Sequence, residues 1–292
     1  MKILASKGLI ELHGAIFLFG LAGLFGKWIH LSPLIIVFGR VIFASLSLGL
    51  FLKLSKKHLF SVKMKPDLIW LLVLGMILTV HWVAFFQSIQ ISTVAVGLLS
   101  YSTFPLFTAF LEPLVFRERL SVFHLILSLG CILGIYLIIP RFDFRDATVQ
   151  GVLWGVLSGL TFSFLTIINR KLSKKYSSVL IAFYQNSAAT VYLSPFLFIL
   201  APNIHFNDVL LMFFLGVICT AGAHTLFIRS VRFLKAQTAA IVGSLEPVYG
   251  IVLAMIFLKE HPGIKTILGG LIILFTAGTV SLSKKNPSYK NS

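Results

Sequence analysis

The sequence predicts an all-α, polytopic membrane protein with ten transmembrane helices in two inverted five-helix repeats. Of the 292 residues, 58% are hydrophobic and only 12% are charged. The mean hydropathy is +0.97. A single soluble core would not bury so much apolar surface. The chain is therefore expected to lie in a lipid bilayer.

Apolar runs of about twenty residues are each long enough to cross roughly 30 Å of hydrocarbon as a helix. The ten expected spans are 9–29, 33–52, 67–89, 92–116, 121–139, 150–169, 177–200, 208–228, 236–258 and 263–282. The longest stretches between spans, 53–66 and 140–149, are too short to fold alone. No separate soluble domain is expected.

A motif in the first half of the chain returns in the second. Phe104-Pro105 precedes Arg117-Glu118, and Glu246-Pro247 precedes Lys259-Glu260, with the last glutamate 13 residues after the proline each time. Because each motif lies in a block of five spans, an odd number, the second block should enter the bilayer from the opposite face. Inverted repeats of this kind are typical of secondary transporters. The two expected repeats are residues 10–140 and 150–283.

The positive charge of the chain follows its connections. A net charge of +16 would suggest nucleic-acid binding in a soluble protein. However, 19 of the 25 Lys and Arg residues fall on one set of alternate connections, five fall on the other, and Arg40 lies within a span. Such an asymmetry marks the cytoplasmic side of a membrane protein. We expect a multi-pass protein of the cell inner (plasma) membrane with cytoplasmic N- and C-termini and no nucleic-acid partner.

The sequence lacks the usual motifs of proteases, hydrolases and ATP-driven pumps. It contains no HExxH, GxSxG, P-loop or GxGxxG motif, so a membrane protease, a hydrolase or an ATP-driven pump would lack its usual parts. Cys131 and Cys219 lie in different halves without metal-ligand spacing. We expect no enzyme activity, no cofactor and no metal site. A membrane-embedded lipid-modifying enzyme is the alternative of another class, but it would need a clustered acid/base pair.

Ionisable groups inside the spans are the strongest site candidates, because a charge in hydrocarbon must face a partner or a wet cavity. Glu246 lies near the middle of the ninth span, and Arg40 lies about seven residues, or ~10 Å, into the second. A buried hydrogen bond for Glu246 and a side chain reaching the interface for Arg40 are the competing interpretations. A protonatable Glu246 would permit proton coupling.

Aromatic and polar side chains inside the spans complete the candidate site. Trp82 with Phe86, and His224 with Phe227, are spaced to share one helical face each. Gln185 lies in a polar island and aligns with Arg40 when the halves are superposed. The expected substrate-binding residues are Arg40, Trp82, Phe86, Tyr101, Tyr184, Gln185, His224, Phe227, Glu246 and Tyr249.

Two prolines are expected to act as hinges. Pro105 and Pro247 fall inside the fourth and ninth spans, where a mid-helix proline would free the carbonyls of Tyr101 and Gly243. Freed carbonyls at this depth are tolerated where protein or cavity water satisfies them. A kink that serves only packing is the alternative.

Glycines at four-residue spacing predict close helix contacts. Gly151, Gly155 and Gly159 form one ridge, and Gly130 with Gly134 forms another. The second pair could instead serve a dimer interface, so a monomer and a homodimer both remain open.

The whole pattern resembles the drug/metabolite transporter superfamily, specifically its ten-helix members with two EamA-type repeats. The residues that carry the resemblance are Arg40, Gly75, Pro105 to Glu118, Gly151 to Gly155, Gly216 and Ser244 to Glu260. Phe104-Pro105 departs from the Glu-Pro form of the second repeat, and Glu112 occupies a position that is usually apolar. The resemblance implies a central cavity closed alternately by spans 3–4 and 8–9.

The expected function is therefore alternating-access transport of a small metabolite, an amino acid or a related compound, with export as the direction that many such relatives have. Uptake of a cationic metabolite such as S-adenosylmethionine or choline is the alternative, because an aromatic cavity can hold a cationic head group by cation–π contacts.

Overall fold

A computed structural model describes residues 2–56, 62, 65–116, 122–139, 143–234, 242–243 and 245–282. Within these residues the structure consists of helices and their connections, without strands. The predicted all-α class is confirmed.

The helices follow the predicted spans in order. Those of the first half are α1 (Lys2–Trp28), α2 (Pro33–Leu54), α3 (Lys65–Ile91), α4 (Val94–Tyr101), α5 (Phe104–Phe116) and α6 (Val122–Ile138). Those of the second half are α7 (Ala147–Leu172), α8 (Ser178–Leu200), α9 (Phe206–Gly216), the π-helical turn η1 (Val217–Gly222), α10 (Ala223–Phe233), α12 (Glu246–Phe257) and α13 (Ile264–Leu282).

Six stretches of these helices are long and apolar enough to cross a membrane. They are Gly8–Trp28, Pro33–Leu54, Lys65–Ile91, Val94–Val115, Ala147–Leu172 and Phe206–Phe233. The predicted fourth span comprises α4 and α5, and the eighth comprises α9, η1 and α10. Of the ninth span, residues 236–241 and Ser244 lie outside the described part, as does Glu118 of the repeated motif.

Short polar residues set several helix starts. The Thr93 side chain accepts a hydrogen bond from Val96 N at 3.2 Å at the start of α4. Asp146 accepts from Thr148 N at 2.7 Å at the start of α7. Such caps satisfy main-chain donors that a helix leaves free in its first turn.

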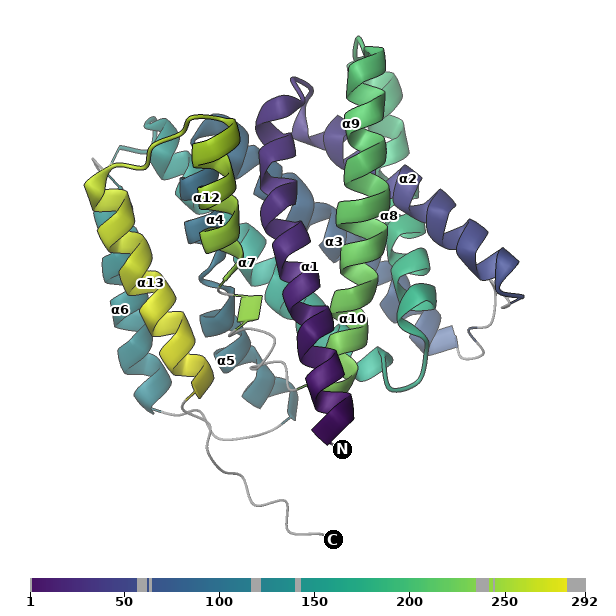
Figure 1. The fold of residues 1–292 in the computed structure, drawn as a ribbon, viewed down its shortest axis with the longest axis horizontal. Coiled ribbons are helices and arrows are strands. Elements are labelled where there is room, and N and C mark those ends of the chain that lie inside the picture. The colour runs from purple at the N-terminus through teal and green to yellow at the C-terminus, as the bar shows by residue number, and fades with distance from the viewer. Residues whose placement is uncertain are drawn as a thin grey trace, which may run out of the picture.

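The two halves pack in matching ways. α1 packs on α10 as α3 packs on α7, and α2 packs on α9 as α8 packs on α3. α2 pairs with its counterpart α8, and α6 pairs with its counterpart α13 at one edge of the molecule (Figure 1). Exchanging each of these helices for its counterpart therefore reproduces these contacts.

Two glycines show this correspondence at atomic detail. A Cβ at Gly75 would lie 3.0 Å from the carbonyl oxygen of Gln185, and one at Gly216 would lie 2.7 Å from that of Arg40. Both glycines allow a neighbouring helix to approach closely. The predicted alignment of Arg40 with Gln185 thus corresponds to equivalent places in the structure.

Counterpart helices run in opposite directions. Lys27, at the end of α1, donates from Nζ to Ser92 O at 2.7 Å in the turn between α3 and α4. The carbonyl of Gly151, near the start of α7, accepts a hydrogen bond from Ser88 beside the same turn. α1 therefore ends at the level where its counterpart α7 begins, as an inverted arrangement requires.

The ends of α1 and α13 define two faces of the molecule. α1 begins and α13 ends on the same side (Figure 1), which we call the terminal face. The other side, where α1 ends and α13 begins, is the opposite face.

The two hinge prolines lie in the first turn of separate half-helices rather than in the middle of a kinked one. α4 ends at Tyr101, and Pro105 is the second residue of α5. Pro247 likewise follows Glu246, the first residue of α12. The first helical turn suits proline, because its missing N–H would have no partner there. The expectation of mid-helix kinks was wrong in this respect, and a hinge role stays a prediction.

The glycine ridges pack inside the chain. A Cβ at Gly159 would lie 2.7 Å from the carbonyl oxygen of Tyr101, directly at the break between α4 and α5. Gly134 packs on Gly269 and Ile273 of α13, with a Cβ 2.8 Å from Gly269 O. The predicted packing role is confirmed for these glycines.

Candidate functional site

A buried hollow lies where the two halves meet. It leaves about 20 Å³ for the centre of a water-sized molecule, enough for roughly one water. Its walls come from α1, α2, α3 and α4 of the first half and from α7, α10 and α12 of the second. The lining residues are Phe19, Ala22, Arg40, Leu78, His81, Trp82, Phe85, Tyr101, Phe162, His224 and Glu246.

Arg40 brings a guanidinium group into this hollow. Its side chain is only 1% exposed, and its Cζ lies 3.7 Å from the centroid of the Trp82 ring. Contact between a cation and an aromatic face is favourable when both are removed from water. Among the described residues no carboxylate lies within 4 Å of Arg40. A buried charge without an ionic partner is costly unless a ligand or a dipole compensates it.

The π-helical turn η1 supplies the hydrogen-bond acceptor for Arg40. Arg40 Nε donates to Thr220 Oγ1 at 2.9 Å. The Thr220 hydroxyl in turn donates to Leu215 O at 2.7 Å. Single π-turns of this kind are rare and occur frequently at functional sites.

Glu246 brings a carboxyl group to the same hollow. It is 3% exposed and interacts with the Tyr101 hydroxyl and, across the hollow, with Arg40. Its Oε2 has no hydrogen-bond partner among the described residues. As the first residue of α12, it lies at the positive end of that helix dipole, which favours a negative group.

Two histidines extend the polar lining. His81 Nδ1 lies 3.0 Å from both the carbonyl and the hydroxyl oxygen of Ser158. The ring of His224 lies edge-on to Trp82 at 5.7 Å, and its Nδ1 has no partner among the described residues. Since buried polar atoms are nearly always hydrogen-bonded, His224 and Glu246 leave room for a polar ligand.

Aromatic rings form the rest of the wall. Phe162 lies 5.1 Å from the ring of His81, 5.4 Å from Tyr101 and 5.1 Å from Phe104. Phe19 packs on Phe162 at 6.5 Å. These separations are those of ordinary aromatic packing, so the polar groups project from an apolar surround.

Five of the ten predicted binding residues line the hollow. They are Arg40, Trp82, Tyr101, His224 and Glu246. Lining the hollow does not show that they bind a substrate, which stays a prediction.

The other five predicted residues lie outside the lining. The centroid of the Phe86 ring lies 5.4 Å from Arg40 Cζ, and Phe227 packs on Phe162 at 5.2 Å. Tyr184 contacts Phe183, Tyr249 contacts Phe17, and Gln185 donates to Asn169 Oδ1. Their expected place in the cavity lining is not seen here.

Several lining residues were not predicted. Phe85 lies four residues after His81 on α3, so the spacing that paired Trp82 with Phe86 could have paired these two. Phe19, Ala22, Leu78 and Phe162 are apolar residues inside apolar spans and carry no sequence signal of their own.

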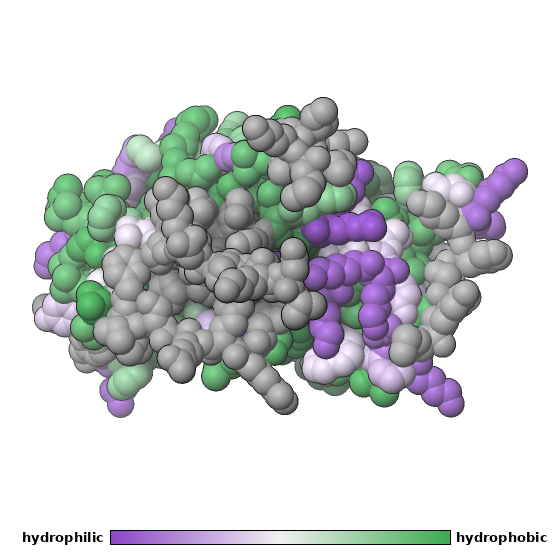
Figure 2. All heavy atoms as spheres, turned by 90° about the horizontal axis from the view of Figure 1, so that it is seen from below, coloured by the Kyte–Doolittle hydropathy of each residue, from purple (hydrophilic) through white to green (hydrophobic). Residues whose placement is uncertain are grey.

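The terminal face is bridged by three ion pairs. Arg229 forms a two-pronged contact with Glu11, at 2.6 and 2.7 Å. Arg170 contacts Glu112 at 2.7 Å, and Lys175 contacts Asp67 at 3.3 Å. In each pair the acid comes from the first half and the base from the second. Figure 2 looks onto this face and shows hydrophilic side chains gathered on it.

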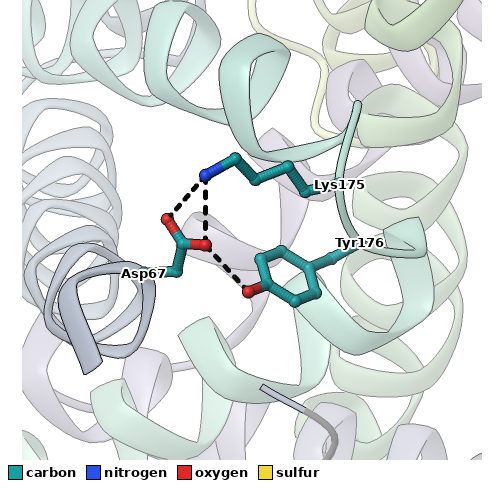
Figure 3. A network of polar contacts seen from close by, with 3 residues as sticks. All are labelled: Asp67, Lys175 and Tyr176. Carbon is teal, nitrogen blue, oxygen red and sulfur yellow. Dashed lines mark hydrogen bonds and ion pairs between the residues drawn. The ribbon is translucent and has the colours of Figure 1, made fainter. Parts of the chain in front are cut away.

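The Asp67 contact includes a tyrosine. Tyr176 donates to Asp67 Oδ2 at 2.8 Å beside Lys175 (Figure 3). Burial, and then the hydrogen bond to Asp67, raise the pKa of Tyr176 above its usual value. The hydroxyl therefore keeps its proton and remains a donor at neutral pH.

The opposite face is joined differently. Glu260 accepts a hydrogen bond from Val94 N at 3.0 Å and so caps α4 from the other half of the chain. Beside this contact lies a pocket of about 130 Å³, lined by residues of α4, α12 and the α12–α13 connection. In the described part of the chain, no ion pair bridges the two halves on this face.

Among the described residues no group of three His, Cys, Asp or Glu side chains is placed to hold a metal ion. The hollow instead offers one guanidinium, one carboxyl group, two imidazoles and a tyrosine hydroxyl within an aromatic surround. These groups suit reversible binding of a small polar molecule with charged ends.

Known proteins resemble this chain over nearly its full length. The "Uncharacterized transporter YxxF" of Bacillus subtilis is 26% identical over 284 residues, covering 96% of this chain and 91% of that protein. The "Uncharacterized inner membrane transporter YicL" of Salmonella typhimurium is 23% identical and covers 96% of each chain. A solved crystal structure of a protein, 16% identical, superposes with a TM-score of 0.68 over 95% of this chain and 97% of its own, so it shares the fold.

The sequence model of one family matches the chain twice. It covers residues 6–139 and again residues 149–282. The chain belongs to the EamA-like transporter family, within the drug/metabolite transporter superfamily, and is a membrane transporter.

Proposed function

We propose that this protein is a secondary transporter that moves a small zwitterionic metabolite, an α-amino acid or a close relative, by alternating access. The observation that carries the proposal is the pair of opposite groups in one buried hollow, Arg40 and Glu246. Arg40 would bind the carboxylate of the substrate, and Glu246 with its free Oε2 would bind the ammonium group or exchange a proton.

The guanidinium is the better-defined half of this site. A planar guanidinium recognises a carboxylate through two parallel hydrogen bonds. Among the described residues no hydrogen bond occupies the terminal Nη1 and Nη2 atoms of Arg40. They are therefore free to bind an anionic ligand group.

The same geometry argues against a purely cationic substrate. Cation–π recognition needs an open aromatic face, and Arg40 covers the face of Trp82. A quaternary ammonium group in the hollow would also meet the positive charge of Arg40. Uptake of choline or a similar cation is therefore the weaker candidate.

Alternating access fits the size of the hollow. About 20 Å³ holds roughly one water, whereas an amino acid is several times larger. Binding would require the walls from the two halves to separate, first on one face and then on the other. Glu246 would couple this cycle to protons if its protonation and substrate binding exclude each other.

Export across the inner membrane, with both termini in the cytoplasm, is the direction and orientation that we propose. The excess of Lys and Arg on the terminal-face connections supports the orientation. A relative is named an inner membrane transporter. The family resemblance supports export, which efflux from preloaded cells would test.

The decisive experiment is counterflow in proteoliposomes with the twenty amino acids. For the amino acid that gives the strongest signal, the analogue without the carboxylate and the analogue without the amino group are compared. We expect both analogues to compete at least tenfold more weakly than the amino acid. Equal competition by the amine alone would support the cationic alternative, and no counterflow with any amino acid would overturn the proposal.

A further inference from the structure

The π-helical turn breaks the symmetry between the two halves. Thr220 stands four residues after Gly216, and Thr79 stands four residues after its counterpart Gly75. Thr79 Oγ1 donates to Gly75 O, four residues back, at 2.9 Å, as in a regular α-helix. Thr220 Oγ1 donates to Leu215 O, five residues back, at 2.7 Å. The same residue type therefore occupies a regular turn in one half and a widened turn in the other.

The two residues that pack on these glycines, Arg40 and Gln185, also differ in their hydrogen-bond partners. Thr220 accepts a hydrogen bond from Arg40 Nε at 2.9 Å. Gln185, at the place equivalent to Arg40, instead donates to Asn169 within its own half. The widened turn therefore lies beside the charged residue Arg40, and the regular turn follows Gly75, on which the neutral Gln185 packs.

The contacts of the Thr220 hydroxyl determine its role. Its single proton is given to Leu215 O, so its oxygen faces Arg40 as an acceptor. Thr220 is fully buried, and so is the main chain of Arg40 where Gly216 packs on it. With Nε held by Thr220 and Cζ 3.7 Å from the centroid of the Trp82 ring, the guanidinium has little freedom to rotate. Its Nη1 and Nη2 atoms are the part left for a ligand.

We propose that Thr220, carried on the π-helical turn, is a positioning residue that fixes the Arg40 guanidinium for the carboxylate of the substrate. This inference rests on the proposed function. Holding a binding group in one orientation before the ligand arrives lowers the entropy cost of binding. Thr220 acts through Arg40 and need not touch the substrate.

The test compares Thr220→Val, which keeps the shape but removes the acceptor, with Thr220→Ser, which keeps the hydroxyl. The matched control is Thr79→Val at the symmetric position. The probe is the amino acid that gives the strongest counterflow with the wild type, compared with its carboxamide. Apparent KM and maximal rate are measured separately, together with thermal unfolding in detergent.

We expect Thr220→Val to raise KM for the amino acid about tenfold, as the loss of one hydrogen bond to a charged group would. Its maximal rate should stay within about twofold of the wild type, while Thr220→Ser should restore KM. KM for the carboxamide should hardly change, because the amide lacks the charge that Arg40 recognises. Thr79→Val should leave both values unchanged.

Other outcomes separate the two proposals. An unchanged KM in Thr220→Val, or equal losses for the amino acid and its carboxamide, would overturn the positioning role. If Arg40→Gln still distinguishes the amino acid from its carboxamide, the proposed carboxylate site fails and this inference fails with it. If Arg40→Gln loses the distinction and Thr220→Val keeps it, only the positioning role is wrong.

Discussion

The Arg40 guanidinium lies over Trp82, with Cζ 3.7 Å from the centroid of the ring. The two residues come from α2 and α3 of the same half, while Thr220, which accepts the hydrogen bond from Arg40 Nε, comes from the other half. The orientation of this charge therefore depends on contact between the halves, and it can change when they move.

Replacing Arg40 by glutamine tests the charge with a side chain that the fold already accepts at the equivalent position, Gln185. We expect Arg40→Gln to fold and to weaken amino-acid binding about 100-fold, as the loss of a bidentate charged contact would. Arg40→Lys should recover only part of the loss, because an ammonium group lacks the planar fork. Isothermal titration in detergent measures both variants, and wild-type affinity in Arg40→Gln would contradict the proposed site.

Replacing Glu246 by glutamine tests coupling. Glutamine keeps the size of the side chain but has no proton to exchange at this position. We expect Glu246→Gln to abolish transport driven by a pH gradient and to spare exchange of substrate across the membrane. Gradient-driven uptake that equals the wild type in proteoliposomes would contradict the coupling role.

Gly159 provides a test of the helix break. A Cβ there would lie 2.7 Å from Tyr101 O and 2.9 Å from Thr103 Oγ1. We expect Gly159→Ala to lower the free energy of unfolding by about 1–3 kcal/mol, the usual cost of overpacking. A Cβ at Gly14 would meet no neighbouring helix within 4 Å among the described residues, so Gly14→Ala is the control and should be neutral or slightly stabilising. Thermal unfolding in detergent compares them, and equal effects would contradict the close contact.

Arg229 tests the ion pairs of the terminal face. Its removal would leave the Glu11 carboxylate, whose side chain is 9% exposed, without its partner. We expect Arg229→Ala to cost about 1–3 kcal/mol of stability, and the exchanged pair Glu11→Arg with Arg229→Glu to recover part of it. Arg232→Ala on the same helix is the control, since among the described residues the Arg232 guanidinium contacts the Phe233 ring, 5.9 Å from its Cζ. No loss in Arg229→Ala would show that the pair adds nothing to stability.

The sequence was sufficient for the fold because its signals are long and repeated. Apolar runs of membrane length, paired Pro and Glu motifs and spaced glycines each recur, and Gly75 and Gly216 have matching main-chain contacts. The place of Arg40 and Glu246 in the lining of the hollow could also be predicted, since an ionisable group at this depth needs a partner or a cavity.

The direction of the other side chains could not be predicted. In a membrane helix the face toward lipid and the face toward protein are both apolar, so hydrophobic periodicity does not separate them. Phe86 and Phe85 are adjacent in the sequence, yet only Phe85 lines the hollow. Gln185 was expected in the cavity as a polar residue, but its Nε2 donates to Asn169 Oδ1 within its own half of the chain.

The break before Pro105 and the turn at Thr220 could not be predicted for a different reason. The same proline is compatible with a kink inside a helix and with the first turn of a new one. A π-turn depends on a shift of one residue in hydrogen bonding, and the sequence around Thr79 and Thr220 offers the same spacing from glycine in both halves.

The division of the terminal-face charges has a consequence for how the halves recognise each other. Glu11, Asp67 and Glu112 belong to the first half, and their partners Arg229, Lys175 and Arg170 belong to the second. In this inverted arrangement a second copy of either half would carry its charges on the opposite face, so two first halves or two second halves would form none of the three ion pairs. Co-expressed as separate polypeptides, the halves should hence associate as heterodimers rather than as pairs of the same half.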